Sequence, residues 1–181
     1  KGITAYEIVN SYEPGKLVKI LRTYGEEKFA TRIVENIVKA RAVAPLNSTT
    51  ELATLVKESI PAATRRTGGN PAKRTFQALR IEANDELGAI TRALPQALDL
   101  LMVQGRLVVM SFQSLEDRIV KELFLEASTS KSPRNLPIEL PEYAAKFSLV
   151  FRSGETPSQS ELDENPRSAS VRLRAIERVA A

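Results

Sequence analysis

The first side chains in this sequence that could do chemistry follow directly on a short apolar run. Residues 107–110 are Leu-Val-Val-Met, and the polar turn after them, residues 111–114, is Ser-Phe-Gln-Ser. Open α/β sheets place their ligand crevice at the carboxyl ends of their strands, where such a turn would lie. We therefore predict a functional surface at residues 111–114.

A second group of polar side chains is spaced as if along one ridge of a helix. Arg74, Gln77, Arg80 and Asn84 follow one another at intervals of three, three and four residues. Guanidinium and amide groups in that arrangement can hold a phosphate and the edge of a base. An ordinary helix with solvent-facing charges has the same spacing, and periodicity alone slightly favours it.

Two residue types are missing, and their absence removes several kinds of site. The 181 residues include no histidine and no cysteine. This excludes Ser-His and Cys-His nucleophilic sites, disulfides, and zinc sites with nitrogen or sulfur ligands. The net charge of +4 is a weak indication of a polyanionic partner, although many soluble proteins are as basic. No apolar run is long enough to span a membrane, and the composition suits a cytoplasmic protein.

The turn at residues 111–114 needs a strand before it and a helix after it. The apolar run predicts a central strand of a parallel sheet, covered on both faces. Ser114 and Asp117 have capping-box spacing, so we expect a helix to begin there. Residues 147–152 and 170–179 have strand character and could pair antiparallel at one edge of the sheet.

The polar ridge would lie on a long helix that begins at Pro71 and ends before Pro95, after which a shorter helix follows. The polar residues 61–70 before it form a linker, and their two glycines alone do not indicate a phosphate-binding loop. Residues 127–146 are rich in Ser, Pro and Lys without periodicity, which predicts a long loop.

The first third of the chain is predicted to be a small helical subdomain. Thr4 and Ser48 each stand three residues before a glutamate, in capping-box spacing, and start apolar helical patterns. Gly25 follows another such pattern and is expected to cap its C-terminus.

Three stretches of the chain closely resemble a known protein family. They are residues 70–87, residues 105–121, and a C-terminal stretch with Thr156-Pro-Ser, Asn165-Pro-Arg-Ser and Leu173-Arg-Ala. In order, spacing and length they resemble the bacterial small-subunit ribosomal RNA (cytosine-N4)-methyltransferases, which depend on S-adenosylmethionine. The first third is similar to the helical domain inserted in that family, especially at residues 24–30.

This resemblance implies a fold, an activity and partners. The fold would be α/β, the C-terminal part of a class I methyltransferase (Rossmann-like) sheet with an inserted helical subdomain. Residues 1–66 would be the helical insertion and residues 67–181 the C-terminal part of the methyltransferase domain. The complete enzyme would use S-adenosyl-L-methionine to methylate N4 of a cytidine in the decoding region of 16S ribosomal RNA, free or in the 30S particle.

The same resemblance assigns roles to the polar residues of the matching motifs. Lys73, Arg74 and Arg80 would contact RNA phosphates, and Gln77 and Asn84 the base or the neighbouring backbone. Ser111, Gln113 and Ser114 would border the substrate pocket. Glu116, Asp117 and Arg118 have two possible roles beside that pocket. Helix capping together with a buried ion pair explains them about as well as participation in catalysis does. For Arg118 we expect structural support.

The chain departs from the family pattern in two ways, of which the first bears on catalysis. Asn70 and Gln113 stand where the family usually carries histidine, and Val103-Gln104 replaces Pro-Gly before the strand. Amine methylation needs a way to shed a proton after the methyl transfer, and neither amide side chain can accept one.

The glycine-rich and acidic motifs of the family's cofactor pocket are missing from this chain, which also begins without methionine. We therefore expect the C-terminal part of a longer enzyme, inactive by itself. The alternatives are a reduced relative or a fragment that only binds ribosomal RNA; a purely structural helical protein explains the polar motif at residues 111–118 less well. Without the missing half, the predicted strand would expose an apolar edge, so the chain should be unstable or self-associate, for example as a homodimer.

Overall fold

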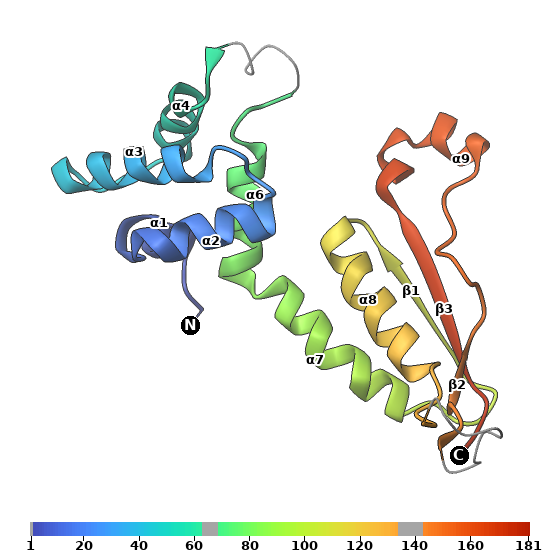
Figure 1. Ribbon diagram of the computed structural model, residues 1–181. Helices are drawn as coiled ribbons and strands as arrows, with labels where there is room; N and C mark the ends of the chain where they lie inside the picture. The colour runs from blue at the N-terminus through green and yellow to red at the C-terminus, as the bar shows by residue number, and fades with distance from the viewer. Residues whose placement is uncertain (1, 63–68, 134–142) are drawn as a thin grey trace. The chain divides into compact units, whose positions relative to one another are not determined.

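The structure is a computed structural model that describes residues 2–62, 69–133 and 143–181 (Figure 1). The chain forms two compact units, Lys1–Glu86 and Leu87–Ala181. The first unit is helical, and the second combines helices with a small sheet, which confirms the α/β class. No helix in the described part of the chain is long and apolar enough to cross a membrane.

The first unit is a group of short helices around one apolar core. Its helices are α1 (Ala5–Ser11), α2 (Pro14–Gly25), α3 (Ala30–Val43), α4 (Thr49–Ser59) and α6 (Lys73–Asn84). Helix α2 packs on both α3 and α6. The most deeply buried core side chains come from α1, α2, α3 and α4, namely Ile8, Leu17, Leu21, Ile33, Val34, Ile37 and Val56.

The two caps predicted in the first unit start helices where the sequence places them, Thr4 as a full capping box and Ser48 as a side-chain cap. The Thr4 hydroxyl accepts from the Glu7 N–H at 3.2 Å, and the Glu7 carboxylate accepts from the Thr4 N–H at 2.7 Å. That backbone hydrogen bond lowers the pKa of Glu7. Ser48 likewise caps α4 by accepting from the Glu51 N–H at 3.1 Å.

The end of α2 differs from the prediction. Gly25 is its last helical residue, and the left-handed cap is Glu26, with φ 49°. Glycine is needed at residue 25 for another reason: a Cβ there would lie 2.6 Å from the Arg74 carbonyl oxygen. The glycine therefore allows α2 to lie against α6, and the cap conformation falls on the next residue.

The long helix predicted from Pro71 to Pro95 is wrong at both ends and in its middle. Helix α6 begins at Lys73 and ends at Asn84, and its C-cap, Asp85, is left-handed with φ 50°. Helix α7 (Glu86–Asp99) then continues through Pro95 without a break. Leu94 and Leu98 are both buried one turn apart, and we attribute the continuity of α7 to this burial, which outweighs the one hydrogen bond that proline removes.

The second unit is a three-stranded antiparallel sheet with α8 (Ser114–Ala127) packed against it (Figure 1). The strand order is β1 (Arg106–Ser111), β3 (Arg172–Arg178), β2 (Phe147–Leu149). Short helices α9 (Gln159–Glu164) and η2 (Pro166–Ser170) precede β3. Leu94, Leu98, Val120, Phe124 and Ile176 form the core between α7, α8 and the sheet.

The two C-terminal strands pair antiparallel as predicted, with Phe147 opposite Arg178. Strand β2 is shorter than predicted, because it ends at Leu149. The sequence places the start of α8 one residue too late: its N-cap is Gln113, with Glu116 as the capping acid. The linker at residues 61–70 and the loop at residues 127–146 lie partly outside the described residues.

Strand β1 is not a central parallel strand within this chain. It lies at the edge of the described sheet, pairs antiparallel with β3, and alternates in exposure along its length. Leu107 and Val109 join the core on the α8 side, while Val108 and Met110 are 55% and 54% exposed. A parallel, Rossmann-like sheet and the division of the family domain at residue 66 stay predictions; the first compact unit itself extends to Glu86.

We expect the isolated chain to self-associate through β1. The strand has an unpaired edge within the described residues, and apolar side chains at Val108, Met110 and Phe112 are exposed beside it. Such edges pair with other chains, and a lysine placed on them opposes this. Val108→Lys should therefore weaken association by about tenfold or more in sedimentation velocity over a concentration series.

Val43→Lys is the matched control, because Val43 is 90% exposed but lies at the end of α3. It should leave the association unchanged. A monomeric wild-type chain at every concentration would contradict the prediction.

Candidate functional site

The polar ridge on α6 is partly used to hold α2. The Arg74 guanidinium donates to the Glu26 carbonyl oxygen at 3.1 Å, and the Gln77 amide donates to the Tyr24 carbonyl oxygen at 3.0 Å. These carbonyls belong to the last turn of α2 and to its cap residue, where helices leave acceptors without intrahelical partners. Arg74 is nonetheless exposed, and its remaining N–H groups can meet a ligand.

The other end of the ridge is neutralised by an acid. Glu86 accepts two hydrogen bonds from Arg80, at 2.8 and 3.1 Å, and one from Asn84 at 3.3 Å. A ligand phosphate would have to compete with this carboxylate for the Arg80 guanidinium. Lys73 is exposed at the first residue of α6. The polar side chains thus form a ridge on α6, but its net positive charge is smaller than the sequence indicates because Glu86 neutralises Arg80.

The turn after β1 is organised by Glu116. Its carboxylate accepts from the N–H groups of Phe112 and Gln113, at 2.9 and 3.2 Å, and from the Gln113 side-chain amide at 3.3 Å. The Gln113 Oε1 atom is buried and has no hydrogen-bond partner within the described residues. Ser111, the last residue of β1, is also buried, while Ser114 is exposed.

Asp117 forms an ion pair, which is one of the roles that the sequence allows for it, and its partner is Arg174. Two hydrogen bonds, 2.6 and 2.9 Å long, join the Arg174 guanidinium to the two Asp117 carboxylate oxygens. The side chains are only 18% and 16% exposed for Asp117 and Arg174. Arg118, in contrast, is exposed and makes no ion pair with any described residue.

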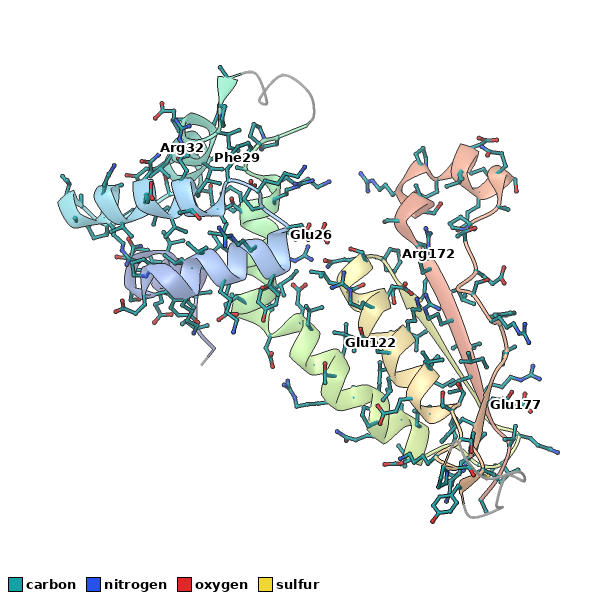
Figure 2. All side chains as sticks on the ribbon, viewed as in Figure 1. Glu26, Phe29, Arg32, Glu122, Arg172 and Glu177 are labelled. Atoms are coloured by element: carbon teal, nitrogen blue, oxygen red, sulfur yellow. The ribbon has the colours of Figure 1, made fainter. Side chains whose placement is uncertain are left out.

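A groove of about 470 Å³ lies beside this ion pair. Its lining residues come from α8 and from the chain entering β3: Ser114, Asp117, Arg118, Lys121, Ser170 and Arg172. Figure 2 shows Arg172 at the N-terminal end of β3. The sequence alone does not predict Lys121, Ser170 and Arg172 as site residues, because only the fold brings α8 and the start of β3 together. The nearest signal in the sequence is Asn165-Pro-Arg-Ser, which resembles the family motif.

The predicted site residues therefore fall into two sets, one in each unit. Lys73, Arg74, Gln77, Arg80 and Asn84 lie on α6 of the first unit. Ser111, Gln113, Ser114, Glu116, Asp117 and Arg118 lie at the end of β1 and the start of α8 in the second. Each set lies within one short stretch of the chain, and the roles assigned to its residues stay predictions.

Among the described residues, the turn between β1 and α8 does not have the form of a cradle for S-adenosylmethionine. The turn between β1 and α8, Phe112-Gln113, has no glycine, and the Gln113 amide and Glu116 carboxylate fill it. A glycine-rich strand-to-helix turn is what brings backbone N–H groups close to such a cofactor. No cofactor residue is therefore assigned among them.

Comparison with known proteins gives one consistent result. The profile of the MraW methylase family matches residues 1–179. The chain is 56% identical over 179 residues to "Ribosomal RNA small subunit methyltransferase H" of Rhodococcus jostii, covering 99% of the chain and 53% of that protein. Proteins of the same name from Corynebacterium diphtheriae and Salinispora tropica are 54% and 55% identical, over 97% and 99% of the chain and 52% and 48% of theirs. The chain thus spans about half the length of these relatives.

Proposed function

Because the chain belongs to the MraW methylase family, we propose that it is the RNA-facing part of an enzyme that methylates small-subunit ribosomal RNA. One observation carries this proposal: identity of 54–56% over 97–99% of the chain to relatives named as methyltransferases of that RNA. The residues that match the family, 1–179, include both units and the two site residue sets.

In finer terms, we propose N4-methylation of a cytidine in the decoding region of 16S ribosomal RNA, in the cytoplasm. S-adenosylmethionine would be held by residues outside this chain, in a Rossmann-like sheet to which β1 contributes a strand. Residues 1–66 would be the helical insertion and residues 67–181 the C-terminal part of the catalytic domain. With the cofactor site outside it, this chain alone would be inactive.

The two amides at the family's histidine positions already serve the local structure. The Asn70 Oδ1 atom accepts from the Ala72 N–H at 2.9 Å just before α6. The Gln113 amide donates to Glu116, as described above. Neither group can take up a proton. In this proposal they position substrate or backbone, and the proton released by the methylated amine passes to solvent.

The test is methyl transfer by the full-length protein. Purified 30S particles and free small-subunit RNA would be incubated with labelled S-adenosylmethionine, and the modified nucleoside identified by mass spectrometry. We expect N4-methylcytidine at a single position. Label on a different base would contradict the finer proposal, and no label on either RNA would contradict the proposal as a whole.

Residues 1–181 by themselves should bind RNA but not S-adenosylmethionine. Isothermal titration with the cofactor should give no binding heat, because the proposal places the cofactor site outside this chain. Fluorescence anisotropy with a single-stranded RNA should show binding that weakens with salt. Cofactor binding by this chain would contradict the placement of the cofactor site outside it. Binding of RNA by a full-length protein without activity would favour the alternative, a non-catalytic ribosomal RNA-binding protein.

A further inference from the structure

The groove beside α8 has an unusual lining for a pocket of its size. Each of its six lining residues is Ser, Asp, Arg or Lys, and none is aliphatic or aromatic. Sites for small organic ligands are mostly apolar, with only a few polar groups. Contacts to the sugar-phosphate backbone come instead from Arg, Lys and Ser side chains. The composition of the groove therefore suits a chain of phosphates better than a cofactor.

The charges in the groove do not cancel one another. Arg118, Lys121 and Arg172 are cationic, and Asp117 is the one carboxylate in the lining. Both oxygens of Asp117 are occupied by Arg174, at 2.6 and 2.9 Å. That ion pair is neutral as a whole, so three positive charges remain for a ligand. On α6, in comparison, Glu86 neutralises Arg80.

The fold also places these groups along one line. Ser114, Arg118 and Lys121 are spaced by four and three residues, so they share one face of α8. Arg172 approaches from β3, and its guanidinium is oriented by a hydrogen bond to the Val171 carbonyl oxygen at 2.8 Å. Ser114 starts α8, where the helix dipole also favours an anion.

We propose that this groove binds the phosphate backbone of the RNA substrate through Arg118, Lys121 and Arg172. It is a second RNA contact, on the second unit, in addition to the polar ridge of α6. The proposal rests on the ribosomal RNA substrate proposed above. Lys121, Arg172 and Ser170 are newly assigned to binding, and Arg118 changes from structural support to a phosphate contact.

The test measures RNA affinity against salt for residues 1–181, by fluorescence anisotropy with a short single-stranded RNA of mixed sequence. Each phosphate contact contributes about 0.7 to the slope of log affinity against log salt. Arg118→Gln and Lys121→Gln should each reduce the slope by about 0.7, and the triple variant with Arg172→Gln by about 2. The triple variant should then bind at least about tenfold more weakly at low salt.

Lys146→Gln is the matched control. Lys146 is an exposed cation of the same unit, just before β2, and β2 pairs with the end of β3 opposite to Arg172. It should keep the wild-type slope. Arg172→Lys should also keep it, since the charge remains. Circular dichroism and thermal unfolding of each variant check that the fold is intact.

Two results would overturn the proposal. One is a triple variant whose slope and affinity change no more than those of Lys146→Gln. The other is that the wild-type chain binds polyglutamate as tightly as RNA and the triple variant binds both ligands more weakly by the same factor. The groove would then suit an acidic protein segment as well as RNA.

Different results would contradict the RNA-binding role of the groove and the proposed methyltransferase activity. If the full-length protein methylates ribosomal RNA while the triple variant binds RNA like the wild type, only the groove assignment is wrong. If the full-length protein transfers no methyl group, the proposed function is wrong, whatever the binding experiment shows for the groove.

Discussion

Asp117→Asn should lower the free energy of unfolding of the chain by about 3 kcal/mol, measured by urea denaturation. The substitution keeps the shape of the side chain and removes its charge. The Arg174 guanidinium, only 16% exposed, would then stay partly buried without a counter-charge. Breaking a buried pair from one side costs about 3–5 kcal/mol, and the residual exposure here places the effect at the lower end.

The predicted loss of stability in Asp117→Asn arises from the unpaired Arg174 guanidinium, and a second substitution can show this. In the double variant Asp117→Asn with Arg174→Gln, no charge remains to be desolvated. We expect the double variant to recover most of the lost stability, so the double-mutant cycle should give a large coupling energy. Equal, additive losses from the two substitutions would show that packing, and not charge, explains the effect.

The same sheet provides the matched control for this ion pair. Arg106 and Glu177 also form an ion pair, at 2.6 Å, but Arg106 is 61% exposed. Glu177 lies toward the other end of β3 from Arg172 (Figure 2). Glu177→Gln should cost about 0–1 kcal/mol, as exposed pairs do. A loss as large as that of Asp117→Asn would contradict the argument from burial.

Local features of this fold could be predicted from neighbouring residues. The caps at Thr4 and Ser48 depend on residues three positions apart, and both form as predicted. The helix after residue 113 and the antiparallel pairing of the two last strands are confirmed as well. These features follow from short-range hydrogen bonds and hydrophobic periodicity, which the sequence displays directly.

Features that depend on distant residues could not be predicted in this way. The continuous apolar run at residues 107–110 predicts a strand covered on both faces, but one face of β1 is exposed in this chain. The break at Asp85 interrupts an apolar pattern that continues beyond it. Aspartate tolerates the left-handed conformation found there but does not require it, so the residue type alone does not predict the break. Continuity through Pro95 likewise depends on the buried neighbours of α7.

The candidate site shows the same division. Its polar residues were found from spacing and family motifs, yet their partners lie far along the chain. Asp117 meets Arg174, 57 residues away, and Gln77 meets Tyr24, 53 residues away. Which cations are neutralised and which remain free to meet a ligand depends on these pairings. The groove lined by Arg118 and Arg172 therefore became visible only in the fold.

Gly25→Ala should also destabilise the chain, by about 1–3 kcal/mol. Gly25 is helical, with no positive φ, so alanine suits its backbone and the effect must come from packing. An added Cβ would lie 2.6 Å from the Arg74 carbonyl oxygen and 3.3 Å from the Ala78 Cβ. These atoms belong to the α6 backbone and to a buried residue, which cannot turn aside as an exposed side chain could.

The methyl group would have to push α2 and α6 apart at the point where they are joined. Residues on both sides of Gly25 accept hydrogen bonds from α6, Tyr24 from Gln77 and Glu26 from Arg74. Both donors belong to the polar ridge proposed to bind RNA. Gly25→Ala should therefore lower stability and also weaken RNA binding, measured on the same sample by urea denaturation and fluorescence anisotropy.

Gly15→Ala separates packing from the general effect of alanine in a helix. Gly15 lies in the first turn of the same helix, is exposed, and has no atom within 4 Å of an added Cβ. There the substitution should stabilise the chain by about 0.5 kcal/mol, because alanine loses less backbone entropy on folding. Opposite signs for the two substitutions would locate the effect at the contact between α2 and α6. A stabilising Gly25→Ala would show that these helices can separate without loss, and the close approach would then not be a requirement of the fold.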